Sequence, residues 1–512
     1  MFVPLWFSTS LVLVNLHAVP FTDKSAGEAE PVEPTALAIV DGKFAYVGTD
    51  AKQARAIGGV GATVIDLSGR TVLPGFNDAH VHLGMQATLG SSASLEIGEV
   101  DKPAFLSRTK EAALGVAGDW LFVRSRHLPD GLTVEDLQKI DKAVVVASSR
   151  GGFLNRRAQQ LGGFTEGECD NGFVRGRLLA AALERIAAHL PAARLAEEAE
   201  RLLDGLRRSG VTSVQLIDEL PALFTSFLVR GTLTARVRMI PLGYRFDTRF
   251  YRPHFDSLDP DYLRVTGVKY FHDDGARLPR YELAELLRLT TADKQQLVVH
   301  VLSARAVDSF LDQLEPAARR DPSLGKLVRF EHVDEISAGA AQRLAALGVV
   351  VCQNPAMLPE WSRQDAFPLR TLKQAGVPLC IGSDWVGDHT PARPYDPFFA
   401  IAQAVDRNQE SLPLYDVIYA YTVGGAIAEG MAGKKGAIAV GQFGDLVVLS
   451  EDPFRLPDRE LARVRAVMTV VGGRVVHRVP GVGEIPKTLT PPQPPSIGPA
   501  PPRTPGSPKK QK

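Results

Sequence analysis

The stretch LPGFNDAHVHLG, residues 73–84, places two histidines one residue apart at the end of an apolar run. In an extended strand, residues i and i+2 point to the same side, so His80 and His82 would present two imidazoles to one point. Neutral imidazole is the commonest protein ligand for zinc-like metals. The pair alone also fits two hydrogen-bonded histidines on a half-exposed strand, so the choice depends on the rest of the chain.

Later apolar segments end in residues of the same chemistry. His300 ends QQLVVH, His332 ends LVRFEH and Asp384 ends VPLCIGSD. In a (β/α)8 barrel, the carboxyl ends of the strands form the face that carries the active site. Four histidines and one aspartate would then converge on a single mouth, which predicts a metal-binding site.

The interior of the chain alternates short apolar segments with amphipathic helical ones, such as YELAELLRLTTA and SAGAAQRLAALG. This alternation predicts an α/β protein whose parallel strands are covered by helices. The length of the segment and the absence of GxGxxG after its first strands favour a (β/α)8 TIM-like barrel over residues 72–430, rather than an open doubly wound sheet.

Both flanks of this segment share a β-rich texture. Runs such as ALAIVDGKFAYVG near the start and GDLVVLSEDPF near the end predict a small discontinuous β-sandwich domain built from residues 1–71 and 431–479. Its first strand is expected at SLVLVN, residues 10–15. The alternative there, a secretion signal, lacks any Lys or Arg before Lys24. Residues 480–512 are rich in proline and are predicted to be a disordered tail.

Bulk properties limit the partners. The 58 basic residues balance 58 acidic ones, so we expect neither nucleic acid nor a membrane among the partners of the chain. Three cysteines without CxxC spacing predict neither a disulfide framework nor a zinc knuckle, and they favour a reducing, cytoplasmic location. We expect a small-molecule substrate, and a homo-oligomeric state is left open.

Several motifs, in order along the chain, resemble the amidohydrolase superfamily. They are LPGFNDAHVHL, GVKYFHDDG, VVHVLSARAVD, VRFEHV and CIGSDW. The resemblance is to the amidohydrolase-3 branch, which contains N-substituted formamide deformylases and D-aminoacylase-like enzymes. It implies that the candidate ligands serve divalent metal ions: His80, His82 and Asp384 bind one ion, and His300 and His332 bind a second.

Lys269, in GVKYF, matches a lysine that many members of the superfamily carry as N6-carboxylysine. An ammonium group has no lone pair for a cation, whereas a carbamate offers two oxygens and can bridge two ions. An ordinary barrel lysine is the alternative. Zinc is the expected metal, but the same ligand types also suit manganese, cobalt, iron and nickel. Whether one ion or two are bound is left open.

The resemblance also implies hydrolysis of a carbon–nitrogen bond, other than a peptide bond, in an amide-like or cyclic amide substrate. A metal-bound hydroxide would attack the carbonyl, with Asp384 as general base and then general acid. Asp384 as a ligand without proton transfer is the alternative. Two other functions stay open: a metal-retaining but catalytically silent protein with a binding or regulatory role, and a metal-dependent esterase or phosphoesterase.

Residues around the predicted site match the family less well. Relatives carry DGH where this chain reads SSRGGFLN, with Arg150 near the histidine position, and GDRA where it reads SARA. Arg150 is a candidate to bind a carboxylate or oxyanion, and His272 and Trp385 are further candidate substrate contacts. A surface role is the alternative for Arg150 and His272. Because adjacent strand residues point to opposite faces, we expect Glu331 to be structural rather than to orient His332.

Overall fold

The computed structural model describes most of the chain between residues 10 and 483. The described residues are 10–22, 33–91, 93–116, 118–125, 127–148, 151–164, 169, 172–174, 186–187, 189–217, 221–241, 259–272, 280–360, 366–384, 395–406 and 409–483. The predicted proline-rich tail lies outside them from residue 484 onward.

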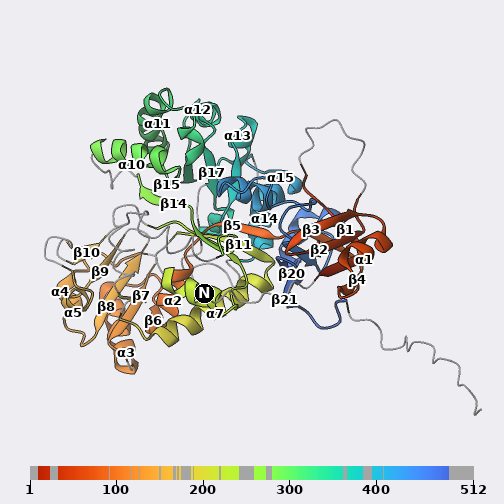
Figure 1. Cartoon of the computed structure of the whole chain (residues 1–512). Helices are drawn as coiled ribbons and strands as arrows, with labels where there is room; N and C mark the ends of the chain where they lie inside the picture. The colour runs from red at the N-terminus through yellow and green to blue at the C-terminus, as the bar shows by residue number, and fades with distance from the viewer. Residues whose placement is uncertain are drawn as a thin grey trace, which may run out of the picture.

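Strands from both ends of the chain share one seven-stranded sheet, at the right of Figure 1. Its order is β21-β20-β19-β4-β1-β2-β3. The bounds are β1 (Leu11–Ala18), β2 (Ala36–Val40), β3 (Lys43–Gly48), β4 (Thr63–Pro74), β19 (Leu446–Leu449), β20 (Ala466–Val471) and β21 (Arg474–Arg478). Helix α1 (Ala51–Gly58) packs on the sheet through Ala54, and Asp50 caps its first turn. The first predicted strand is thus confirmed, while the limits of the β-domain stay a prediction.

Two parallel sheets occupy the middle of the molecule. One has the order β13-β12-β11-β5, and the other has the order β14-β15-β16-β17-β18. Their bounds are β5 (Phe76–Val81), β11 (Val211–Leu216), β12 (Arg236–Met239), β13 (Leu263–Val265), β14 (Gly267–Phe271), β15 (Gln296–Val301), β16 (Val328–His332), β17 (Val350–Gln353) and β18 (Leu379–Ile381). The predicted α/β class is confirmed.

The two parallel sheets meet at both pairs of edges. At one junction a single residue, Thr266, separates β13 from β14, and the backbone N–H of Lys269 donates to the carbonyl of Pro241 at 2.7 Å. At the other, the N–H of Asp384 donates to the carbonyl of His80 at 2.8 Å. A Cβ on Gly382 would lie 2.5 Å from the backbone N of His80, so only glycine allows this close approach.

Helices alternate with these strands along the chain and pack against them in the largest hydrophobic cluster. Their bounds are α7 (Ala192–Arg208), α8 (Pro221–Val229), α10 (Arg280–Asp293), α11 (Ala304–Ala318), α12 (Ala340–Leu347), α13 (Leu369–Gln374), α14 (Pro397–Val405), α15 (Leu414–Tyr419) and α16 (Gly425–Ala428), with a π-helical turn η3 (Ala420–Gly424). The hydroxyl of Ser303 accepts from the N–H of Ala306 at 3.1 Å and caps α11. No helix in the described part of the chain combines the length and apolarity that a membrane crossing needs.

A further five-stranded sheet lies between β5 and β11 in sequence and forms the lower left of Figure 1. It has its own buried clusters, one of them around Trp120 and Phe122. Its order is β10-β9-β8-β7-β6, and the bounds of this region are α2 (Leu83–Ser91), β6 (Ala93–Glu96), α3 (Lys102–Gly115), β7 (Trp120–Arg124), α4 (Val134–Leu137), β8 (Ala143–Ser148), β9 (Gly151–Leu154), α5 (Arg156–Leu161) and β10 (Phe173–Val174). This sheet was not predicted from the sequence.

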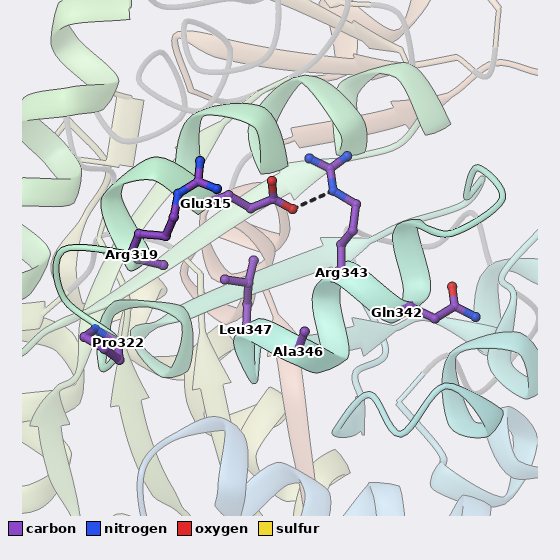
Figure 2. A pocket seen from close by; sticks show the side chains of 8 residues that line it. Glu315, Arg319, Pro322, Gln342, Arg343, Ala346 and Leu347 are labelled. Atoms are coloured by element: carbon purple, nitrogen blue, oxygen red, sulfur yellow. Dashed lines mark hydrogen bonds and ion pairs between the residues drawn. The ribbon is translucent and has the colours of Figure 1, made fainter.

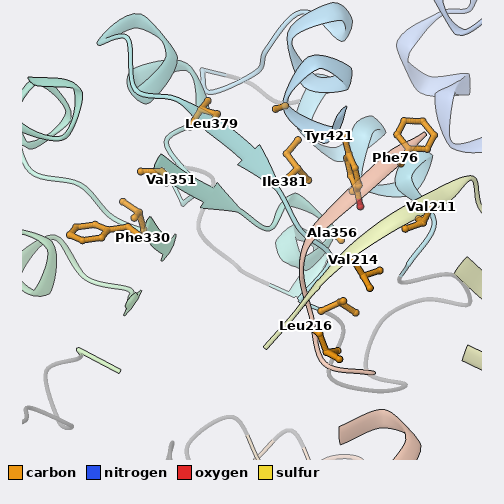
Figure 3. Close-up of a cluster of buried hydrophobic side chains, with 14 of the residues drawn as sticks. Phe76, Val211, Val214, Leu216, Phe330, Val351, Ala356, Leu379, Ile381 and Tyr421 are labelled. Carbon is orange, nitrogen blue, oxygen red and sulfur yellow. The ribbon is translucent and has the colours of Figure 1, made fainter. Parts of the chain in front are cut away.

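The largest hydrophobic cluster joins the two parallel sheets to their helices. In Figure 3, Phe76 of β5, Val214 of β11 and Ile381 of β18 lie close to Tyr421 of η3. The rings of Phe76 and Tyr421 pack edge to face with their centroids 5.6 Å apart. This core makes the strands rigid supports for the polar residues at their ends.

A buried ion pair connects the parallel sheet to the terminal one. Arg236 of β12 donates to Asp445, just before β19, from Nε at 2.7 Å and from Nη2 at 3.0 Å. We expect Asp445→Asn to lower the free energy of unfolding by about 3–5 kcal/mol, because it leaves a buried guanidinium uncompensated. Urea denaturation measures this change. Asp141→Asn, in the exposed pair with Arg157, is the control, and an equal effect of both substitutions would refute the expectation.

Candidate metal centre

Three ligand atoms face one another where β5 and β18 end. Nε2 of His80 lies 3.2 Å from Nε2 of His82, and each of these atoms lies 3.3 Å from Oδ1 of Asp384. Ligand atoms held at about 2.0–2.1 Å around a tetrahedral zinc ion are themselves about 3.3 Å apart. The triangle therefore has the size that a single bound ion requires. The side chains of His82 and Asp384 keep 15% and 18% of their surface exposed, so solvent reaches part of the triangle.

Glu331 fixes the tautomer of His80. Its Oε2 is hydrogen-bonded to Nδ1 of His80, and a carboxylate only accepts, so Nδ1 carries the proton and Nε2 carries the lone pair. As predicted, Glu331 does not orient His332; its contact with His80 was not predicted. Alternation does turn Glu331 away from His332, but it turns it toward His80 on another strand. His332 itself has a left-handed backbone with φ of 72°, so the alternation ends at this residue.

His332 and His300 lie beside this triangle. Nδ1 of His332 donates to Oδ1 of Asn354 at 2.8 Å, which leaves its Nε2 as the acceptor. The ring centroid of His332 lies 5.0 Å from that of His80 and 4.6 Å from that of His300. His80, His332 and Asp384 together could hold an ion. Four predicted histidines and the predicted aspartate are thus gathered in one place.

Lys269 points its amine into a buried position near the same cluster. The residue is 2% exposed, and its Nζ has no hydrogen-bond partner among the described residues. Burial lowers the pKa of Lys269 to about 8, against the opposing influence of Glu331 and Asp384. Its charge contributes to the lowered pKa of His80 and of His300, so the amine lies within electrostatic range of both.

Two further features mark the cluster: a strained backbone at three residues and the carboxylate of Asp78. His332, Val333 and Asp384 have positive φ angles of 72°, 49° and 47°, a conformation that costs of order 1–3 kcal/mol per residue and is typical of functional sites. Asp78, which the sequence analysis did not single out, accepts from the N–H of Ser383 at 2.9 Å and thereby joins β5 to β18. The only sign in the sequence that Asp78 belongs to this cluster is its position two residues before His80.

A family model described as the Amidohydrolase family matches residues 63–477, which is most of the chain. The chain belongs to the amidohydrolase family. The amidohydrolase-3 branch that the sequence motifs predicted is confirmed. The expectation that the chain is an enzyme of the amidohydrolase class is also confirmed.

Relatives of this amidohydrolase cover nearly the same length. It is 24% identical to an N-substituted formamide deformylase of Arthrobacter pascens, over 86% of this chain and 94% of the relative. A metal-dependent hydrolase of Pyrococcus horikoshii matches with a TM-score of 0.67 at 19% identity, over 88% of this chain and 99% of that one. Atrazine chlorohydrolase of Arthrobacter aurescens, solved with zinc, matches with a TM-score of 0.57 at 14% identity, over 91% of this chain and 95% of that one. At these identities the structural matches establish the fold.

Of the three predicted substrate contacts, the structure describes only His272. Arg150 and Trp385 lie outside the described residues. His272 is buried, and its ring packs edge to face on Phe310 of helix α11 and lies beside Tyr270. His272 of the amidohydrolase thus contacts helix α11 through Phe310.

A cavity between helices α11 and α12 lies at the surface, and none of the candidate ligands lines it. This cavity of about 490 Å³ is lined by residues of α11 and α12 and of the turn between α11 and β16, as Figure 2 shows. Arg343 points along it but is paired with Glu315 at 2.6 Å, Asp312 at 2.7 Å and Asp308 at 3.4 Å. Its charge is therefore already balanced.

Burial favours the uncharged form of three candidate ligands of the amidohydrolase, His80, His300 and His332. It lowers the pKa of His80 from an ordinary value of 6.5 to about 3, and it also lowers the pKa of His300 and of His332. Between pH 6.5 and about 3, His80 is protonated in the unfolded chain but not in the folded chain. The free energy of unfolding therefore falls as the pH falls from about 7 toward 3. Burial raises the pKa of Asp78 to about 6, so this carboxyl binds a proton more readily in the folded chain and favours folding at lower pH. Asp78 is one group, and the three buried histidines outweigh it.

We therefore expect the chelator-treated protein to unfold at lower urea concentration at pH 5 than at pH 7.5. The variant His80→Gln should lose part of this dependence, because one of the three buried imidazoles is gone. A urea midpoint that is the same at both pH values would contradict the expectation.

Proposed function

We propose that this amidohydrolase is a metal-dependent hydrolase that cleaves an amide-like or cyclic amide carbon–nitrogen bond in a small molecule. The observation that carries the proposal is the triangle of His80, His82 and Asp384, whose edges of 3.2–3.3 Å suit one divalent ion. The relative named N-substituted formamide deformylase supports the choice of bond. Location in the cytoplasm stays a prediction, and the oligomeric state stays open.

The proposed architecture is a (β/α)8 barrel made of the two parallel sheets, with the terminal sheet as a discontinuous β-domain. It is supported by the hydrogen bonds that join the sheets at both junctions, Lys269 to Pro241 and Asp384 to His80. In a barrel, all the candidate ligands would lie at the carboxyl ends of their strands, where this fold builds its active sites.

We assign the first ion to His80, His82 and Asp384, and a second to His300 and His332. Zinc is the proposed metal, because imidazole and carboxylate are its usual ligands. The ions, when bound, would activate water and polarise the substrate carbonyl. The protein contributes neutral imidazoles of fixed tautomer and a partly exposed face through which a small substrate can approach.

Lys269 is proposed to carry a carbamate. A neutral amine attacks carbon dioxide, an N–C bond forms and one proton leaves, so the product is an anion with two oxygens. Nζ is buried and has no hydrogen-bond partner among the described residues, and burial lowers its pKa to about 8; both favour the neutral amine that this step needs. The carbamate would then supply the ligand that the second ion shares with the first.

Asp384 is proposed to move the proton. Its carboxylate would accept a proton from the attacking water and deliver it to the leaving nitrogen, so that the amine departs neutral. Burial alone would raise the pKa of Asp384, but the surrounding histidines keep it below its ordinary value. The side chain is therefore ionised at neutral pH and ready to accept.

The experiment combines metal analysis of the purified protein with a hydrolysis screen over formamides, N-acyl amino acids, lactams and simple esters. Bound metal and turnover of an amide substrate would support the proposal. Turnover of esters alone would favour the esterase alternative, and tight metal without turnover of any class would favour the silent one. Absence of bound metal under all loading conditions would overturn the proposal.

A further inference from the structure

Arg329 of β16 is fully buried and donates to three different strands. Its Nε is bonded to Glu331 of the same strand, its Nη1 to Oε1 of Gln215 on β11, and its Nη2 to the carbonyl of Ala79 on β5 at 2.9 Å. A guanidinium is a planar fork with fixed donor directions, so three partners on three strands leave it a single orientation. Ala79 precedes His80 directly, so the arginine also holds the backbone that carries this histidine.

Glu331 connects the fixed guanidinium of Arg329 to the ring of His80. One of its oxygens accepts from Arg329 and the other accepts from Nδ1 of His80, so both ends of the carboxylate are occupied. Gln215 is held in turn by the carbonyl of Gly425 at 2.9 Å and by Asn77 at 3.3 Å. All the polar groups in this chain of contacts are buried, so no solvent competes for them.

We infer that Arg329 is a positioning residue for the metal centre: it holds Glu331 beneath His80 and so directs Nε2 of His80 at the ion. The inference rests on the proposed function, because it presupposes that His80 is a metal ligand. Arg329 is not itself a candidate ligand; it acts on His80 through the carboxylate of Glu331 and through the carbonyl of Ala79.

The test is the dissociation constant for zinc, measured by competition with a chromophoric chelator. We expect Arg329→Met and Glu331→Gln each to weaken zinc binding about 10–100-fold, the range typical of groups that orient metal ligands. Because the side-chain route from Arg329 to His80 runs through Glu331, the losses in the two single variants should not add, and the double variant should bind zinc nearly as well as Glu331→Gln, with only the hydrogen bond to Ala79 lost in addition. The double variant also buries no unpaired charge, so it keeps the test valid if Arg329→Met does not fold.

Asp445→Asn is the matched control for Glu331→Gln, since both convert a buried, arginine-paired carboxylate into an amide. We expect it to reduce stability and to leave the zinc affinity unchanged. Zinc affinities within twofold of the wild type in the double variant and in Glu331→Gln would overturn the inference alone. A loss for Asp445→Asn equal to that for Glu331→Gln would also overturn it. Absence of zinc binding by the wild-type chain would overturn both this inference and the proposed function.

Discussion

Asp384→Asn is expected to lower kcat on the best substrate by about 10²–10⁴-fold, the contribution typical of a positioned proton-transfer group. The amide keeps the size of the side chain and one oxygen near His80 and His82, which lie 3.3 Å from Oδ1 in the wild type. It cannot accept the proton of the attacking water. The measurement is steady-state hydrolysis at several zinc concentrations, up to saturation.

Saturation with metal separates the two roles of Asp384. If Asp384 is only a ligand, excess zinc restores kcat; if it transfers protons, kcat stays low with the site full. Asp458→Asn, an exposed carboxylate on the 3-10 turn η5 (Asp458–Arg463), is the control and should behave as the wild type. Full activity of Asp384→Asn would remove Asp384 from the mechanism.

Lys269→Ala is expected to reduce both metal content and activity, the activity by at least about 10²-fold. Groups that merely orient ligands are worth 10–100-fold, and a bridging carbamate would be worth no less. The truncated side chain leaves space beside His300 and His332, so added propionate should restore part of the activity by supplying a carboxylate. Lys326→Ala, at an exposed lysine, is the control.

The carbamate itself can be observed. After growth and incubation with carbon-13-labelled bicarbonate, the wild type should give a carbamate signal by carbon-13 NMR, and Lys269→Ala should lack it. Wild-type protein that is active and metal-bound but has no such signal would refute the carbamate and leave Lys269 as an ordinary buried lysine.

The candidate ligands could be predicted from sequence because their signals are local. His80 and His82 share a face through the two-residue period of a strand, and His300, His332 and Asp384 each terminate an apolar run. The supporting residues could not be found in this way. Glu331 reaches His80 across 251 residues, and Arg329 reaches Gln215 across 114, so only the folded strands bring these pairs together.

Two parts of the fold show why sequence patterns fail. Alternation placed Glu331 on the correct face, but it gave no information about the strand that this face meets. Two strands of the sheet of β6 to β10 are too short to display a period in the sequence: β6 spans four residues and β10 two. The terminal strands were easier to predict, because hairpin turns mark them in the sequence.

Metal content after His82→Ala tests the central claim most directly. His82 is partly exposed, so its removal should disturb the fold less than removal of the buried His80. After exhaustive dialysis and loading with zinc, elemental analysis should find at least one ion per chain in the wild type and a loss of that ion in His82→Ala, with His17→Ala unchanged. A His82→Ala variant that retains the zinc content of the wild type would contradict the account.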